Sequence, residues 1–322
     1  MFPSESDLTI CFAHVAYQLQ QRFALRKLPI RTFGVTSHDE LDVAIGEADV
    51  LVISGLWRNE LAPRAPKLRF IQSVGAGTDQ FDAAVLKERG IRLASAQGVN
   101  VNAVSEHVMS LILALARRLP EARDNQAKRV WRGMISDLSQ REDEIAGKTL
   151  LVVGLGGIGG RLARLAKAFD MRVIGVKRDL SRGTEGADSV HMLAELKRLL
   201  PQADFVALTC PLTRETENVI DAAALAKMKP CAYLINAARG RCVEQGALIE
   251  ALRKGSIAGA ALDVTVDEPL PPASPLWDLS NVFITPHTAG ETRRYEDNVL
   301  DILLDNLQRL SRGEAMLRNQ IL

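Results

Sequence analysis

The sequence predicts an α/β protein made of two doubly wound parallel-sheet domains. Three observations lead to this prediction. The chain has 322 residues, which is about twice the size of an ordinary domain. Short apolar runs alternate along it with segments of helical periodicity, a pattern typical of βαβ units and a parallel sheet. A glycine-rich loop near the middle of the chain joins one apolar run to a helical segment.

Composition and charge exclude several classes of protein. Hydrophobic residues make up 47% and charged residues 25% of the chain, as in average globular domains, so there are enough apolar side chains for two cores. The chain holds 40 basic and 39 acidic residues, a net charge of +1. Because nothing in this balance attracts nucleic acid or an anionic membrane, we expect neither as a partner.

Signals for membrane insertion, secretion and metal binding are missing from the sequence. The longest apolar stretch, Val108–Ala116, is much shorter than the ~20 residues that span a bilayer. The first ten residues, MFPSESDLTI, lack the basic start of a signal peptide. The four cysteines include no CxxC pair, which argues against a zinc site, and scattered thiols fit a reducing compartment. We therefore expect a cytoplasmic protein with no bound metal.

The first hundred residues alternate between apolar runs and helical patterns. Strands are predicted at Leu8–Ala13, Val50–Ser54, Leu68–Val74 and Ile91–Ser95, and helices between them at Tyr17–Leu25, His38–Ile45 and Ala83–Arg89. We expect residues 1–99 to form the first domain. A longer helix is predicted over Asn102–Arg118, because its apolar residues recur on one face at the 3.6-residue period.

A second alternation follows this helix. Strands are predicted at Leu150–Val153, Met171–Lys177, Asp204–Pro211, Ala232–Ala237, Ile257–Val264 and Asn281–Pro286. A last helix is predicted from Glu291 to Leu310. We place the second domain at residues 100–290, and we expect the C-terminal segment 291–322 to complete the first domain.

The glycine-rich loop predicts a Rossmann dinucleotide-binding domain at residues 100–290. It reads Gly154-Leu155-Gly156-Gly157-Ile158-Gly159 and lies between a strand and a helix, the context in which this motif is specific. Gly154 permits the tight turn, Gly156 lets the backbone approach a pyrophosphate, and Gly159 allows the helix to pack closely on the strand. The start of the helix then offers free amides to the phosphates.

The strand after this motif ends in basic residues. Lys177 and Arg178 stand at its end and Arg182 lies nearby, with Asp179 as the acidic residue among them. An NAD site usually places a carboxylate here for the ribose hydroxyls, whereas cations pair with the 2′-phosphate of NADP. We therefore predict NADP as the coenzyme, with NAD as the second choice. The alternative is a solvent-exposed basic turn that binds no ligand.

Three ionisable residues follow predicted strands of the second domain: Arg239 in NAARG, Glu268 in DVTVDEPLP and His287 in ITPHTAG. Ligands of open α/β sheets bind where strands end. Reduction of a 2-oxo acid requires a cation for the carboxylate and an acid that protonates the developing alkoxide. Arginine offers a planar fork to a carboxylate, histidine exchanges protons near neutral pH, and a neighbouring glutamate stabilises the imidazolium.

Several segments together resemble the D-isomer-specific 2-hydroxyacid dehydrogenase family. They occur in the order SVGAGTDQFD, GLGGIG, CPLTRET, MKPCAYLINAARGRCVEQGAL, ALDVTVDEPLP and NVFITPHTAG, and they extend over most of the chain. The resemblance implies a flavodoxin-like substrate domain beside the Rossmann domain. It also implies that the protein uses hydride from the nicotinamide to reduce a small 2-oxo acid, of the glyoxylate or hydroxypyruvate type, to the D-2-hydroxy acid.

The resemblance also assigns roles to individual residues. Arg239 would bind the substrate carboxylate and carbonyl, and Glu268 would pair with His287 as the general acid and base. Asp263 would hold the nicotinamide amide, and the backbone of Val74 and Gly75 would hold the substrate carboxylate. Further cofactor contacts are expected from Cys210, Pro211, Ala237, Ala238 and Ala289.

Other functions of similar chains remain as alternatives. They are a dinucleotide-sensing, corepressor-like binding protein, a phosphoglycerate dehydrogenase and a phosphite dehydrogenase. Formate dehydrogenases of the superfamily carry glutamine in place of the paired glutamate, so Glu268 argues against formate oxidation. The predicted helix Asn102–Arg118 and the segment after it are expected to form a homodimer interface, as in the family. Trp57 follows a strand of the first domain and is expected either to border the substrate or to pack within its own domain.

Overall fold

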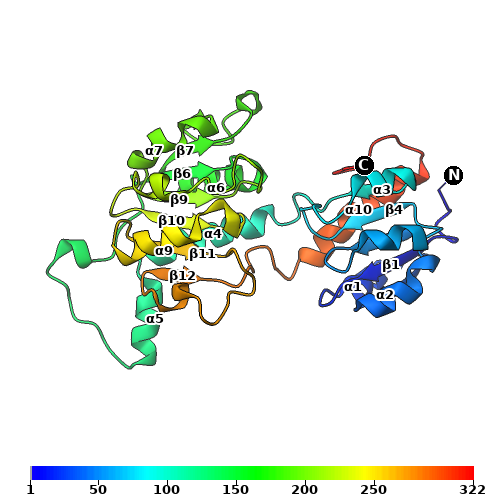
Figure 1. Ribbon diagram of the computed structural model, residues 1–322, viewed down its shortest axis with the longest axis horizontal. Coiled ribbons are helices and arrows are strands. Elements are labelled where there is room, and N and C mark those ends of the chain that lie inside the picture. The colour runs from blue at the N-terminus through cyan, green and yellow to red at the C-terminus, as the bar shows by residue number, and fades with distance from the viewer. Residues whose placement is uncertain (1) are drawn as a thin grey trace. The chain divides into compact units, whose positions relative to one another are not determined.

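The chain folds into two compact units, each built on one parallel sheet (Figure 1). The first unit holds the residues up to Asn100 together with Thr292–Leu322, and the second holds Val101–Glu291. The structure is a computed structural model that describes residues 2–322, without the side chains of Ser139 and Arg182. Its two parallel-sheet α/β units confirm the fold class that the sequence predicts.

The first unit has a five-stranded sheet in the order β2-β1-β3-β4-β5. Its strands are β1 (Thr9–Ala13), β2 (Arg31–Val35), β3 (Val50–Ile53), β4 (Phe70–Ser73) and β5 (Arg92–Ala94). This is the flavodoxin-like order, in which the strand sequence reverses next to β1. Ligands of such sheets bind beyond the carboxyl ends of the strands, which is where the residues that follow β1, β3 and β4 lie.

Helices cover both faces of this sheet, because successive side chains of a strand point to opposite sides. Ile10 and Phe12 of β1 pack in the core under α1 and α10. Cys11 and Ala13 pack in the core on the other face, under α2 and α3. The helices of the unit are α1 (Leu19–Ala24), α2 (His38–Ala44), α3 (Ala83–Glu88) and α10 (Tyr295–Ser311), with short 3-10 helices η1 (Ile45–Glu47) and η2 (Asn59–Arg64).

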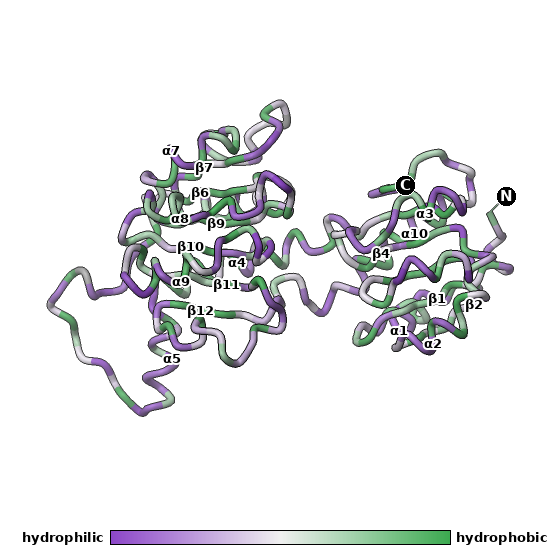
Figure 2. The backbone as a smooth tube through the Cα atoms, in the orientation of Figure 1, coloured by the Kyte–Doolittle hydropathy of each residue, from purple (hydrophilic) through white to green (hydrophobic). Residues whose placement is uncertain are grey.

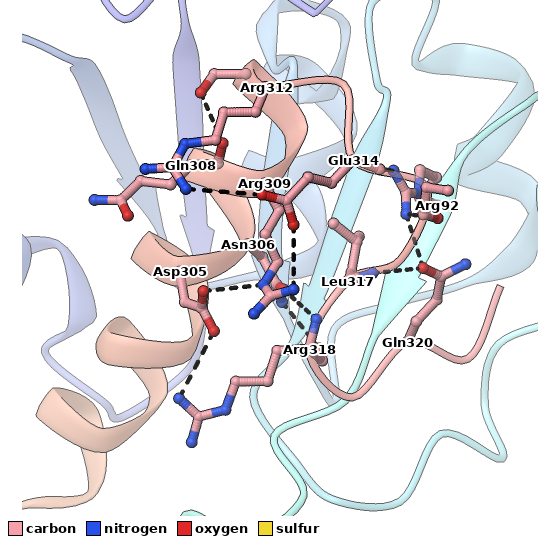
Figure 3. A network of polar contacts seen from close by, with 12 residues as sticks. Arg92, Asp305, Asn306, Gln308, Arg309, Arg312, Glu314, Leu317, Arg318 and Gln320 are labelled. Atoms are coloured by element: carbon pink, nitrogen blue, oxygen red, sulfur yellow. Dashed lines mark hydrogen bonds and ion pairs between the residues drawn. The ribbon is translucent and has the colours of Figure 1, made fainter.

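Polar contacts fix the C-terminal segment to α10 and to the edge of the sheet (Figure 3). Asn306 is fully buried; its Nδ2 donates to Oε1 of Gln72 at 3.1 Å, and its Oδ1 accepts from the amide of Arg318 at 2.7 Å. The amide of Ile321 donates to the carbonyl of Leu93 at 2.8 Å. The last residues of the chain are therefore an integral part of the first unit.

The second unit has a seven-stranded sheet in the order β12-β11-β10-β9-β6-β7-β8. Its strands are β6 (Thr149–Val153), β7 (Arg172–Val176), β8 (Ser189–His191), β9 (Phe205–Leu208), β10 (Tyr233–Asn236), β11 (Gly259–Leu262) and β12 (Val282–Ile284). The order reverses between β6 and β9, as in Rossmann domains, and this reversal creates the crevice in which dinucleotides bind.

The strands of the second unit are also covered on both faces. Leu150 and Val152 of β6 share a core with α4 and α6, and Leu151 and Val153 share one with α7, α8 and α9. The helices are α4 (Val101–Ala116), α5 (Leu119–Ala127), α6 (Gly157–Ala168), α7 (Leu196–Leu199), α8 (Ala222–Leu225) and α9 (Gln245–Arg253). The 3-10 helices are η3 (Leu138–Gln140), η4 (Leu180–Arg182), η5 (Leu193–Glu195), η6 (Leu200–Gln202), η7 (Gly240–Cys242) and η8 (Pro275–Asp278).

Helix α5 and the segment after it extend away from the sheet of the second unit (Figure 1). Figure 2 shows mainly hydrophilic residues along α5, which has no buried residue among those described. A helix without a buried face gains little stability from packing within its own unit.

Two strands, β2 and β8, are missing from the sequence-based prediction, and both lie at edges of their sheets. Arg31 of β2 is exposed, and all three residues of β8 are half-buried. Because an edge strand is only partly covered, its sequence lacks the continuous apolar run by which buried parallel strands are recognised.

Candidate active site

The glycine-rich loop has the geometry that a dinucleotide requires. Gly154 has a φ of +103°, and a Cβ on it would lie 2.5 Å from the Cα of Cys210. A Cβ on Gly159 would lie 2.4 Å from the carbonyl oxygen of Gly154, so helix α6 packs on β6 as closely as backbones allow. A Cβ on Gly156 would meet nothing within 4 Å. The loop is thus crowded on its protein side and open where a pyrophosphate would approach.

The start of α6 adds favourable electrostatics to this open face. The amides of Gly154 and Leu155 both donate to the carbonyl of Val176, at 2.8 and 3.0 Å, and tie the loop to β7. The next amides, of Gly157, Ile158 and Gly159, belong to the first turn of α6, where a helix has no internal acceptors for its N–H groups. Free amides and the helix dipole favour an anionic phosphate here.

Two cations of the basic turn after β7 have described side chains, and one of these two is engaged while the other is free. The ammonium of Lys177 donates to the carbonyl of Gly183. The exposed guanidinium of Arg178 has no partner among the residues that the structure describes. Oδ1 of Asp179 accepts from the amide and hydroxyl of Ser181, at 3.0 and 2.7 Å. The side chain of Arg182 lies outside the described part of the chain.

The other expected cofactor residues follow neighbouring strands. Cys210 and Pro211 come after β9, Ala237 and Ala238 after β10, and Asp263 after β11. Because these parallel strands lie side by side next to β6, their carboxyl ends share one edge with the glycine-rich loop. Contact with the Cys242 thiol and burial raise the pKa of Cys210, so its thiol stays protonated and is no nucleophile.

Arg239 follows β10 with its side chain exposed. Its Nη1 donates to the carbonyl of Ala238 at 2.7 Å, and no carboxylate pairs with it among the side chains described. A Cβ on Gly240 would lie 2.0 Å from the carbonyl carbon of Thr265, so this position must be glycine and the Arg239 loop packs directly on the segment after β11. The backbone that carries Arg239 is therefore held beside the segment that leads to Glu268, while the charge of the guanidinium remains available to a ligand.

Glu268 and His287 form a hydrogen-bonded pair. Oε2 of Glu268 lies 2.6 Å from Nδ1 of His287, and Oε1 accepts from the amide of Thr265 at 3.1 Å. Both side chains remain accessible, with exposed fractions of 37% and 50%. The pairing at Nδ1 leaves Nε2 as the ring nitrogen that can exchange a proton with a substrate.

Asp263 holds the loop that carries His287. Its side chain is 2% exposed; Oδ1 accepts from Oγ1 of Thr285 at 2.7 Å and from the amide of Thr288 at 3.0 Å. Oδ2 accepts from the amide of Ala289 at 3.2 Å, and the Asp263 carbonyl accepts from the amide of His287 at 2.8 Å. These bonds support the φ of +55° at His287, which costs energy in a residue with a side chain.

Two supporting residues of this loop were not identified as such from the sequence. Nε2 of His107, on α4, lies 3.0 Å from Oγ1 of Thr285. The Thr285 hydroxyl donates its hydrogen to Asp263, so it can only accept a hydrogen bond from His107. Nε2 of His107 is therefore the protonated ring nitrogen. His107, Asp263 and Thr285 are too far apart in the chain for a local motif to reveal their contact.

In the first unit, the surroundings of Gly75 suit the expected substrate contact better than those of Val74 or Trp57. The amide of Val74 donates to Ile53 at 2.9 Å, and its carbonyl accepts from the Tyr295 hydroxyl at 2.8 Å, so Val74 has no polar atom left for a carboxylate. The Gly75 amide has no partner among the described residues. Trp57 is 5% exposed, and its Nε1 donates to Asn59. This placement favours the expectation that Trp57 packs within its own unit, and Gly75 is the residue of this loop whose amide can still donate to a substrate carboxylate.

Two findings on the described residues concern membranes and metal ions. None of their helices combines the length and the apolar character needed to cross a membrane. No group of three or more His, Cys, Asp or Glu side chains among them is placed to hold a metal ion.

Comparisons with known proteins agree with this geometry. The family model for the D-isomer specific 2-hydroxyacid dehydrogenase, NAD binding domain, matches residues 109–289. A glyoxylate reductase from Korarchaeum cryptofilum is 34% identical over 312 residues, which cover 91% of this chain and 93% of that protein. The chain belongs to this family. The family prediction is confirmed, and the chain is an oxidoreductase of this family with a domain for a nicotinamide dinucleotide.

Two further relatives of the chain carry other names, and one of them is a longer protein. A D-3-phosphoglycerate dehydrogenase from Methanocaldococcus jannaschii is 34% identical over 284 residues, which are 87% of this chain and 53% of that protein. The crystal structure of a D-isomer specific 2-hydroxyacid dehydrogenase family protein from Aeromonas salmonicida has a TM-score of 0.85 and 32% identity, with coverage of 98% of this chain and 99% of that one.

Proposed function

We propose that this D-2-hydroxyacid dehydrogenase reduces a small 2-oxo acid of the glyoxylate or hydroxypyruvate type to the D-2-hydroxy acid. The observation that carries the proposal is the 2.6 Å contact between Glu268 and His287. An Arg239 guanidinium without a carboxylate partner among the described side chains supports it. A hydrogen-bonded acid and a free cation are the two groups that carbonyl reduction requires of a protein.

The residues would divide the reaction as follows. Arg239 binds the substrate carboxylate and polarises the carbonyl oxygen. NAD(P)H, held at the glycine-rich loop, would supply the hydride for the carbonyl carbon. His287 gives the proton on Nε2 to the oxygen as it becomes an alkoxide, and Glu268 stabilises the imidazolium and keeps the ring in place. Gly75 donates its amide to the substrate carboxylate.

A steady-state assay tests this function. NADPH and NADH are each supplied with glyoxylate or hydroxypyruvate, and the loss of absorbance at the nicotinamide band is followed. We expect repeated turnover and a product of D configuration. Binding of dinucleotide without turnover on any 2-oxo acid would instead favour the corepressor-like alternative. Faster turnover on phosphite or on a phosphorylated acid would favour the corresponding dehydrogenases.

The basic turn after β7 supports a preference for NADP(H). Arg178 offers an exposed guanidinium, and the carboxylate of Asp179 accepts from Ser181. A free cation pairs with a 2′-phosphate, whereas a carboxylate in the same place would repel it. Lys177 can contribute once its ammonium exchanges the Gly183 carbonyl for the phosphate. The ratio of kcat/KM for NADPH and NADH measures this preference.

The segment after α4 supports a homodimer. Trp131 is 98% exposed, and Val130, Met134 and Leu138 are exposed beside it. Apolar side chains grouped on an extended segment gain stability when another surface covers them, and we propose that a second copy of this chain does so. Analytical ultracentrifugation tests this: we expect a dimer in the wild type and a monomer in Trp131→Glu.

The thiols support a reducing, cytoplasmic location. All four cysteines are free; Cys11, Cys210 and Cys242 are buried and Cys231 is exposed. Free thiols are typical of proteins that work in a reducing compartment. Fractionation of cells that express the chain tests the location.

A further inference from the structure

We propose that His14 binds an uncharged hydroxyl group on the carbon beyond the keto group, so that a 3-hydroxy-2-oxo acid is the preferred substrate. The inference rests on the proposed function, because it assumes that a 2-oxo acid binds at the carboxyl edge of the first sheet. It goes further by naming the substrate class and a recognition residue in the first unit.

The sheet register places His14 in line with the loop that carries Gly75. Ala13 of β1 is the partner of Ile53 in β3, and Ile53 is the partner of Ser73 in β4. The residues that follow these three are His14, Ser54 and Val74, which therefore form one row across three neighbouring strands. At a spacing of ~4.8 Å between strands, His14 starts about 10 Å from Val74, a distance that an imidazole and a three-carbon acid together span.

Local contacts fix the tautomer of His14. Its Nδ1 accepts from the amides of Ala16 at 3.1 Å and Tyr17 at 2.9 Å. Since Nδ1 accepts, the ring proton lies on Nε2. Nε2 has no partner among the described residues. The ring stacks on that of Tyr17, with centroids 4.1 Å apart and an angle of 2° between the planes, so this free donor has a fixed direction.

An aromatic series connects His14 with the carboxylate loop. The ring of Tyr17 lies 5.1 Å from that of Tyr295 on α10, and the Tyr295 hydroxyl donates to Val74 at 2.8 Å. The donor on His14 and the loop that ends in Gly75 are therefore held in one packed arrangement. A preorganised donor loses little entropy when it binds a ligand.

The charges around His14 favour a hydroxyl over a phosphate. Burial lowers the pKa of His14, and the nearby Glu296 carboxylate opposes this only in part, so the ring is neutral near pH 7. Glu296 accepts from the amide of Gln18 at 3.4 Å. Arg22 on α1 and Arg26, two residues after the end of that helix, pair with Asp297, and Arg26 also pairs with Asp301. A neutral donor suits an uncharged acceptor, and the carboxylate beside it repels a dianion.

The local role of His14 has to be separated from ligand binding. Nδ1 caps the turn between β1 and α1, and that role alone would explain a histidine here. The variant His14→Asn separates the two roles, because its amide oxygen can take the place of Nδ1 while nothing replaces the N–H at Nε2. His38→Asn, an exposed histidine at the start of α2, is the matched control, and thermal unfolding of each variant reports whether the turn is intact.

The experiment compares kcat/KM for hydroxypyruvate with that for 2-oxobutanoate, which has a methyl group in place of the hydroxyl. We expect a preference of roughly tenfold for hydroxypyruvate in the wild type, as one neutral hydrogen bond allows. We expect a ratio near one in His14→Asn and the wild-type ratio in His38→Asn. The ester of hydroxypyruvate with phosphate on carbon 3 should be a poorer substrate of the wild type than hydroxypyruvate.

Other outcomes overturn the inference. They are a wild-type ratio near one, a wild-type preference for the phosphate ester, or an unchanged ratio in His14→Asn. Where the variant does not fold, a wild-type ratio near one or a wild-type preference for the phosphate ester still overturns the inference. If the protein reduces glyoxylate but its kcat/KM is the same for hydroxypyruvate and 2-oxobutanoate, the role of His14 is wrong and the proposed function stands. If it reduces no 2-oxo acid, both are wrong.

Discussion

The Tyr295 hydroxyl donates a 2.8 Å hydrogen bond to the carbonyl of Val74 in the buried interior of the first unit. This bond joins the first turn of α10 to the loop after β4, although the two residues lie 221 positions apart in the chain. Burial raises the pKa of Tyr295, so the phenol keeps its proton at neutral pH and remains a donor. The bond fixes the loop whose next residue, Gly75, offers its amide.

Tyr295→Phe removes this bond and leaves the Val74 carbonyl buried without a partner. We expect the free energy of unfolding to fall by about 1–2 kcal/mol, the usual cost of such a group, and KM for a 2-oxo acid to rise more than kcat falls. Urea denaturation and steady-state kinetics measure the two effects. Tyr233→Phe is the control, because the described residues include no hydrogen-bond partner for the Tyr233 hydroxyl; equal effects of the two variants would contradict the assignment.

Arg239→Lys keeps the positive charge and loses the planar fork. We expect kcat/KM for the 2-oxo acid to fall by at least ~10²-fold, the size of an oriented charge contact to the reacting group. The dissociation constant of the coenzyme, measured by fluorescence titration, should change little. Arg241→Lys alters a guanidinium two residues away that pairs with Glu217 and should keep its activity. Near-normal turnover in Arg239→Lys would remove this residue from the substrate site.

Glu268→Gln keeps the size of the side chain and removes its charge. Because the carboxylate holds the His287 ring by a hydrogen bond at Nδ1, we expect kcat for reduction to fall by roughly 10²-fold, within the usual range for general acid catalysis. Asp267→Asn neutralises the neighbouring exposed carboxylate and serves as the control. A Gln variant with wild-type kcat would show that the pair is structural.

The double variant Lys177→Ala, Arg178→Ala tests the coenzyme preference. We expect the wild type to favour NADPH over NADH by roughly a hundredfold, which two charge-assisted hydrogen bonds can provide, and the double variant to lose most of this preference. Arg253→Ala, at the end of α9, removes a surface charge elsewhere in the same unit. The assignment fails if the wild type prefers NADH or if the double variant keeps the ratio.

Asp188 contributes stability that depends on pH. The Lys167 ammonium at 2.8 Å and the Val173 amide at 2.7 Å lower the pKa of its carboxyl. A lowered pKa in the folded state adds stability above the unfolded value of about 3.9, and this stability is lost as the pH falls below it. We expect Asp188→Asn to be less stable than the wild type at pH 7 and at pH 5, and the difference to shrink only as the pH falls below about 4, as measured by urea denaturation. A constant difference would contradict this linkage.

The sequence predicts the buried strands and the site loops well for physical reasons that particular residues show. Strands such as β6 are covered on both faces, so their apolar runs are unmistakable. The glycines at 154 and 159 are required by contacts of 2.5 and 2.4 Å that a side chain would make, and this requirement produces the motif. The pair of Glu268 and His287 follows strands β11 and β12, whose ends meet at one edge of the sheet.

Other features depend on contacts that no local pattern reveals. The edge strands β2 and β8 have too few buried residues to produce an apolar run. Trp57 is an aromatic residue in a strand-end loop, and only the fold shows that its ring packs in the core. His14 and Thr285 act through the register of neighbouring strands and through a hydrogen bond to Asp263, and both depend on residues far away in the chain.

The distribution of the cysteines makes the folded state easy to follow in solution. Cys231 is exposed, whereas Cys11, Cys210 and Cys242 lie in the cores of the two units. A maleimide dye added to the native protein should therefore label one thiol per chain, at a single known place in the second unit. Labelling of Cys11 then reports opening of the first unit and labelling of Cys210 and Cys242 opening of the second, so that mass spectrometry of the labelled peptides distinguishes which half of the molecule unfolds first.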